Sequence, residues 1–284
     1  EPFERGIPDA IASLDYGEEA ASKAATAIMT TDTREKEIAV EFTVGGKTCR
    51  LGGMLKGSGM IRPNMATTLT FLTTDCAIAP AMIQQALSEV VRLTLNRVSV
   101  DGDTSTNDMV CVMANGLAGN AEITKEGADY AMFRDALYAI LLNLARMCAA
   151  DGEGATKLIE CIVSGAESES IAETIAKSII CSSLFKAAMF GADANWGRIA
   201  CAMGYSDCAF DISKVDVKMA SAKGEIAVAE KGFGIPFSED KAKEVLLEDE
   251  IQVLIHLNSG ECSACAWGCD LTYDYVKING DYRT

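Results

Sequence analysis

Apolar residues recur along the chain with two different periods, and segments of the two kinds alternate. Spacings of three and four residues predict helices over five ranges, which are 20–28, 80–94, 129–149, 171–185 and 240–247. Alternating or β-branched apolar runs predict strands at 38–42, 49–51, 68–73, 109–113 and 158–163, two more within 215–228, and a final two that end near Asn279. Helices that alternate with strands predict an α/β fold.

The residues after the longest predicted helix indicate a domain boundary. The segment Asp151-Gly152-Glu153-Gly154 ends this helix, because glycine readily leaves the helical conformation. A chain of 284 residues is long enough for about two domains. We therefore expect one α/β domain over 1–155 and a second, smaller α/β domain over 156–284.

Charge and composition exclude several classes of partner. The chain has 41 acidic and 25 basic residues, and its net charge of -16 repels nucleic-acid phosphates and anionic lipid headgroups. No run of 18 apolar residues and no export signal occurs, and the odd count of eleven cysteines favours reduced thiols. These features predict a soluble, cytoplasmic protein that binds neither nucleic acid nor a membrane.

Histidine and metal chemistry have little support in the sequence. His256 is the single histidine, and it lies on the polar side of an alternating strand. Cys262 and Cys265 form one C-x-x-C pair, for which buried reduced thiols are favoured over a zinc site. We expect no metal and no cofactor.

Two aspartates after an apolar strand leave one alternative open. Asp101 and Asp103 are spaced as the nucleophile and the magnesium ligand of an aspartyl-phosphate phosphohydrolase would be. The competing interpretation is a polar loop whose aspartate side chains cap its own backbone.

A glycine-rich segment carries the strongest candidate chemistry. It runs from Lys56 through Gly57-Ser58-Gly59 and ends at Ala66 and Thr67, where the chain enters a predicted strand. If the bond between Ala66 and Thr67 is cut, Thr67 carries a hydroxyl nucleophile and an α-amine base on one residue.

This segment, KGSGMIRPNMAT, resembles the self-cleavage motif of the ornithine acetyltransferases, which are the glutamate N-acetyltransferases of the arginine pathway. Further agreement extends over most of the chain, at 27–33, 100–108, 151–157, 193–199 and 267–284. The resemblance implies autocleavage between Ala66 and Thr67. It also implies a layered α/β sandwich of the self-processing aminopeptidase type, with Thr67 in domain 1–155, and an α2β2 heterotetramer of cleaved chains.

The resemblance also implies a reaction and a set of contacts. Thr67 takes the acetyl group of N-acetylornithine, and glutamate then removes it; whether acetyl-CoA is a second donor stays open. The family's substrate contacts fall on six residues of this chain, which are Thr33, Lys56, Thr67, Glu153, Asn279 and Thr284. Lys56 suits a substrate carboxylate and Glu153 suits the ornithine ammonium.

One part of the family pattern has no counterpart in the sequence. The family's oxyanion hole uses a Thr-Gly pair, and no Thr-Gly dipeptide occurs here. We therefore expect an N-terminal part of the family's chain to be missing, which leaves the oxyanion hole unassigned. An inactive fragment or a non-enzymatic subunit is the remaining alternative.

Overall fold

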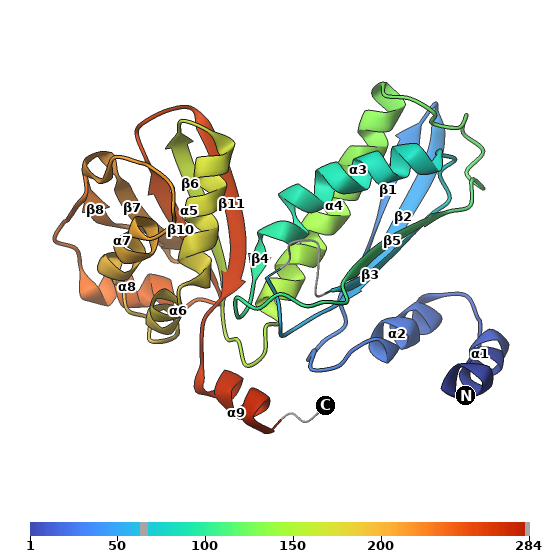
Figure 1. Ribbon diagram of the computed structural model, residues 1–284, viewed down its shortest axis with the longest axis horizontal. Helices are drawn as coiled ribbons and strands as arrows, with labels where there is room; N and C mark the ends of the chain where they lie inside the picture. Colours follow the sequence, from blue (N-terminus) through green and yellow to red (C-terminus); the bar gives the residue numbers. More distant parts are fainter. Residues whose placement is uncertain (63–67, 282–284) are drawn as a thin grey trace.

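A computed structural model, which describes residues 1–62 and 68–281, contains two separate β-sheets that lie in different lobes (Figure 1). The first sheet has the strand order β1 (Glu37–Val44), β2 (Lys47–Lys56), β3 (Leu69–Thr74) and β5 (Met109–Ala114). Its first three strands are antiparallel, and β5 runs parallel to β3. Gly45 and Gly46 form the hairpin turn between β1 and β2.

Two long helices cover one face of this sheet. They are α3 (Pro80–Leu93) and α4 (Ala128–Ala150), and both follow the helical spacing seen in the sequence. Phe133, Leu137, Ile140 and Leu144 of α4 recur at intervals of three or four and are fully buried. Burial of this stripe stabilises the helix against the sheet.

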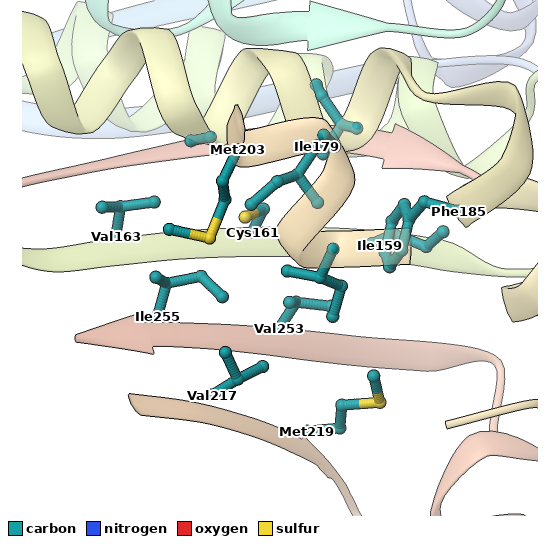
Figure 2. Packing of buried hydrophobic residues seen from close by; sticks show 14 of the residues in the cluster. Ile159, Cys161, Val163, Ile179, Phe185, Met203, Val217, Met219, Val253 and Ile255 are labelled. Atoms are coloured by element: carbon teal, nitrogen blue, oxygen red, sulfur yellow. The ribbon is translucent and has the colours of Figure 1, made fainter. Parts of the chain in front are cut away.

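The second sheet has seven strands. Their order is β4 (Val98–Ser99), β11 (Cys262–Cys269), β6 (Leu158–Ala166), β10 (Glu250–His256), β7 (Asp216–Ser221), β8 (Gly224–Glu230) and β9 (Phe233–Gly234). The helices that accompany it are α5 (Glu169–Cys181), α6 (Ser183–Phe190), α7 (Trp196–Gly204) and α8 (Glu239–Leu246). Figure 2 shows Val163 of β6 and Ile255 of β10 packed beneath Met203 of α7.

The predicted mixed α/β fold is confirmed, and the two sheets have separate hydrophobic cores. The cores do not follow the expected boundary in every detail. β4 belongs to the second sheet although it lies in 1–155, while Leu158 and Trp267 pack in the first core. The division into domains 1–155 and 156–284 stays a proposal.

The structure corrects two of the secondary-structure predictions made from the sequence. The helix predicted over 171–185 is two helices, because Ser182 leaves the helical conformation and its side chain caps α6. The end of the chain, predicted as strand to near Asn279, is instead the helix α9 (Tyr273–Asp281) after β11. A helix α1 (Pro2–Ala12) and the helix α7 were not predicted, whereas α2 (Glu18–Ala27) was.

No helix among the described residues is long and apolar enough to cross a lipid bilayer.

Candidate active site

The segment after β2 is held in place by hydrogen bonds to three other parts of the chain. The backbone N–H of Gly57 donates to Asp32 Oδ1 at 2.7 Å, and Ser58 Oγ donates to the backbone oxygen of Asp151 at 2.7 Å. Met60 has a left-handed φ of 56°, which is uncommon for a residue with a side chain. Its backbone N–H donates to Asp101 Oδ2 at 2.6 Å, and this bond offsets part of the strain.

Asp101 is a structural anchor for this segment. Its carboxylate accepts the backbone N–H groups of Met60, Ile61 (2.9 Å) and Asp103 (3.2 Å), and the hydroxyl of Tyr275 at 3.4 Å. A carboxylate offers about four acceptor positions, so Asp101 has none left for a phosphoryl group. Asp103 is exposed. The loop-capping interpretation of these aspartates therefore fits the structure, and no observation favours the phosphohydrolase.

A buried lysine forms ion pairs with two carboxylates next to the start of the segment. The side chain of Lys36 is fully buried, and its Nζ donates to Asp32 Oδ1 at 2.6 Å and to Asp151 Oδ2. Burial by itself raises the pKa of Asp32, but hydrogen bonds from Lys36 and Gly57 outweigh it and hold the pKa below its usual value. This ion triad fixes the start of the glycine-rich segment.

Thr33 is attached to the same triad. Its backbone N–H donates to Asp151 Oδ2 at 3.1 Å, and its hydroxyl also donates to the Asp151 carboxylate. Thr33 therefore lies against Asp151, the residue that follows α4. Asp151 precedes Glu153 by two positions in the sequence.

Glu153 and Asn279 meet at the centre of the site. The Nδ2 of Asn279 on α9 donates to Glu153 Oε2 at 2.7 Å, and the backbone N–H of Glu153 donates to the backbone oxygen of Ser58 at 2.9 Å. A Cβ at Gly59 would overlap the Glu153 carboxyl group, so only glycine permits this approach. At Gly154, a φ of 68° and the closeness of the Tyr275 backbone likewise require glycine.

A cavity of about 780 Å³ adjoins these residues. It lies between the segment after α2, the end of α4 and α9, where Thr33, Asp151 and Gly154 form part of its wall. Carboxylates outnumber cations on its lining: the acidic residues are Asp151, Asp249, Glu250, Asp274 and Asp281, and the basic ones are Arg34 and Lys277. The lining favours a ligand with a positively charged group.

Lys56 is the last residue of β2 and pairs with Leu69 at the start of β3. Its positive charge opposes the rise that burial causes in the pKa of Asp108, which immediately precedes β5. Among the residues expected to contact substrate, Thr33, Glu153 and Asn279 are brought together around the glycine-rich segment, and Lys56 begins that segment. Ala66, Thr67 and Thr284 lie outside the described residues.

Cys148 is the thiol that contacts the glycine-rich segment. Its Sγ lies 3.4 Å from the backbone oxygen of Gly57, and burial raises the pKa of the thiol to about 12. A thiol with this pKa stays protonated at neutral pH, so Cys148 packs against the segment without acting as a nucleophile.

Sequence reasoning missed Lys36, Asp32 and Tyr275. Nothing in the local pattern marks Lys36 as buried, since it precedes an alternating strand with exposed charges. The position of Asp151 gives a weak indication of the buried lysine. Asp151 lies at the carboxyl end of α4, where the helix dipole disfavours a negative charge, and this position predicts a nearby cation.

Comparisons with known proteins agree over the whole chain. A sequence profile of the ArgJ family matches residues 1–284. The chain is 50% identical over 279 residues to "Arginine biosynthesis bifunctional protein ArgJ 1" of Clostridium acetobutylicum and 52% identical over 279 residues to "Arginine biosynthesis bifunctional protein ArgJ" of Symbiobacterium thermophilum. Each alignment covers 98% of this chain and 68% of the relative.

A solved structure is also similar. The crystal structure of arginine biosynthesis bifunctional protein ArgJ from Bacillus halodurans superposes with a TM-score of 0.70 and 47% sequence identity. The match covers 74% of this chain and 97% of the solved chain.

Proposed function

The chain belongs to the ArgJ family, and we propose that it is a glutamate N-acetyltransferase of arginine biosynthesis that moves the acetyl group of N-acetyl-L-ornithine to L-glutamate. The observation that carries the site assignment is the contact between Glu153 and Asn279. These residues are 126 positions apart, yet they meet at 2.7 Å against Gly59 of the glycine-rich segment.

Thr67 is the nucleophile in this proposal. Its Oγ attacks the acetyl carbonyl of N-acetylornithine and forms an ester bond, while the amide C–N bond breaks. The α-amine of Thr67 takes the hydroxyl proton and delivers it to the nitrogen of the leaving ornithine. The amine of glutamate then attacks the ester, N-acetylglutamate leaves, and Thr67 Oγ regains a proton.

The charges around the site suit this substrate. Glu153 receives the ornithine ammonium, and the acidic cavity beside Thr33 favours the same positive group. Lys56 binds the α-carboxylate, and Asn279 orients Glu153 through the hydrogen bond that it donates. Thr284 completes the set of contacts. Acetyl-CoA as a second acetyl donor is an open part of the proposal.

Thr67 acquires a free α-amine by autocleavage after Ala66. This step leaves 218 of the 284 residues in the second piece. The solved Bacillus halodurans chain has a similar length: 74% of 284 residues is about 210, and these make up 97% of a chain of about 217. The agreement supports a mature chain that begins at Thr67. We further propose that the cleaved chains assemble as an α2β2 heterotetramer in the cytoplasm.

Intact-mass analysis of the purified protein tests the nucleophile. We expect two pieces with a break between Ala66 and Thr67, and acetyl transfer from N-acetylornithine to glutamate. Thr67→Ala should abolish both cleavage and transfer, whereas Thr67→Ser should retain part of each because serine keeps the hydroxyl. A folded protein that stays whole yet transfers acetyl groups would show that Thr67 is not the nucleophile.

A further inference from the structure

Residues 151–157 join α4 to β6 and carry Glu153, and this connection is anchored at both ends. At its start, the buried ion triad holds the residue that follows α4. At its far end, the carboxylate of Asp270 accepts the backbone N–H groups of Thr156 at 2.8 Å and Lys157 at 3.0 Å. The same carboxylate also accepts the Thr156 hydroxyl at 2.5 Å. The position of Glu153 then depends on what holds the middle of the connection.

One side chain reaches the middle of this connection. The hydroxyl of Thr272, a buried residue, donates a hydrogen bond of 2.7 Å to the backbone oxygen of Gly154, the residue next to Glu153. Gly154 has a left-handed φ of 68°, so the chain turns sharply after Glu153. The Thr272 hydroxyl therefore fixes the peptide group on the far side of this turn.

Thr272 is also the residue from which α9 starts. It immediately precedes Tyr273, the first residue of this helix. Asn279, on the same helix, donates at 2.7 Å to Glu153 Oε2. Helix α9 is thus tied to two adjacent residues, to Gly154 through Thr272 at its start and to Glu153 through Asn279 near its end. The first bond sets where the second can form.

The start of α9 matters because the helix has no buried face. None of its residues, all of which the structure describes, is buried. A short helix gains most of its stability from a buried apolar face, so α9 depends instead on polar and ring contacts. These include the hydrogen bond from Tyr275 to Asp101 at 3.4 Å and the edge-to-face packing of Tyr273 on Phe190. The bond made by Thr272 fixes the point from which these contacts extend.

We propose that Thr272 is a positioning residue for the proposed acetyl transfer. Its hydroxyl holds the turn at Gly154 against the start of α9, and this contact keeps the Glu153 carboxylate beside Asn279, where it receives the side-chain ammonium of N-acetylornithine. The inference rests on the proposed function, because it requires that Glu153 contacts this ammonium.

This role predicts a selective loss. Without the Thr272 hydroxyl, Glu153 and Asn279 can shift relative to each other, and a charge-assisted hydrogen bond weakens steeply as its geometry departs from the optimum. Only the ammonium end of the substrate meets Glu153. N-acetylnorvaline has the same carbon chain as N-acetylornithine but lacks the side-chain amine, so its use should not depend on Thr272.

Substitutions at Thr272 in the full chain test the proposal. Thr272→Val removes the hydroxyl and keeps the branched shape. We expect kcat/KM for N-acetylornithine to fall by about tenfold, mainly through a higher KM, while kcat/KM for N-acetylnorvaline changes little. Thr272→Ser should recover most of the wild-type ratio between the two substrates, because serine retains the donor. Thr272→Ala is a second variant with the same expected loss of this ratio.

Thr94→Val is the matched control. Thr94 is also buried, and its hydroxyl also donates to a backbone oxygen at 2.7 Å, which is that of Val90 in the last turn of α3. This variant should use both substrates as the wild type does.

A double substitution shows whether Thr272 acts through Glu153. In Glu153→Gln the charge that Thr272 positions is absent, so the addition of Thr272→Val should lower kcat/KM for N-acetylornithine by no more than about a further twofold. Two residues that act independently would instead show the loss of about tenfold again.

The outcomes separate the two proposals. A wild-type protein that transfers no acetyl group would overturn the proposed function, and with it the role of Thr272. An active wild type, with Thr272→Val and Thr272→Ala variants that keep normal kinetics or lose both substrates equally, would overturn the role of Thr272 alone. Independent losses in the double variant would do the same. Failure of Thr272→Val to cleave would show that the residue supports the fold around the nucleophile, which would also overturn its positioning role.

Discussion

Asn279 Nδ2 donates a hydrogen bond of 2.7 Å to Glu153 Oε2, and this contact joins the last helix of the chain to the turn after α4. The same helix reaches the glycine-rich segment through Tyr275, whose hydroxyl donates to Asp101 at 3.4 Å. Burial raises the pKa of Tyr275, and the negative charges of Asp101 and Glu153 raise it further, so its hydroxyl stays protonated and remains a donor. Helix α9 therefore connects Glu153 to the segment that precedes Thr67.

Glu153→Gln should weaken the use of N-acetylornithine by about ten- to a hundredfold, because glutamine keeps the shape but not the charge that meets the ammonium. Cleavage at Thr67 should continue, since it needs no bound substrate. Steady-state kinetics beside a denaturing gel separate the two effects. Normal kinetics in this variant would show that Glu153 does not contact the substrate. Failure of the variant to cleave would show that Glu153 instead supports the structure around the nucleophile.

Gly59→Ala should imitate the loss of Glu153. The added Cβ would overlap the Glu153 carboxyl group, which must then leave its position beside Asn279. We expect kcat/KM for N-acetylornithine to fall by about tenfold or more, because small displacements of a substrate contact have large effects on rate. Gly52→Ala on β2 is the control, since its nearest neighbour would be an ordinary contact of 3.8 Å. Equal kinetics for the two variants would contradict the close packing of Gly59 against the Glu153 carboxyl group.

Lys36→Met should lower the free energy of unfolding by about 3–5 kcal/mol, because it leaves Asp32 and Asp151 buried without their shared cation. Urea denaturation measures this change. The comparison is Lys218→Met, which removes an exposed ion pair with Glu225 and should cost at most about 1 kcal/mol. Equal effects for the two lysines would mean that the triad contributes no more than a surface pair.

Stability should respond to pH through Asp108 in the uncut protein. The folded pKa of about 6 exceeds the ordinary value of 3.8, so between these values the folded state retains a proton that the unfolded state has lost. The folded form therefore loses stability as pH rises from about 4 to about 6. Thermal unfolding of Thr67→Ala, with and without Asp108→Asn, measures the difference between the variants.

That difference should be smallest below pH 4 and should grow in favour of the asparagine variant until about pH 6, after which it stays constant. A difference that did not change with pH would mean that the Asp108 carboxyl group has an ordinary pKa in the folded chain.

Several features of the site were predictable from the sequence. The segment from Lys56 to Thr67 is irregular because of its glycines and proline, and its residues carry the family motif in one continuous stretch. Helices such as α4 were predicted almost to their ends, since a buried helix face repeats every three or four residues within a single element. Local patterns of this kind need no knowledge of distant segments.

The assembly of the site was decided by the tertiary structure. Asp32, Lys36 and Asp151 form one buried triad only because the segment between α2 and β1 meets the end of α4, and Glu153 meets Asn279 only because α9 folds back to the turn after α4. The segment Tyr273–Asp281 was predicted as strand and is the helix α9, although none of the residues of this helix is buried. Its position depends on Asn279, Tyr275 and the glycine at 154, which are contacts with distant residues. The spacing of apolar residues indicates which face of a helix or strand is buried. Which residues pack against that face depends on the arrangement of the elements in the tertiary structure.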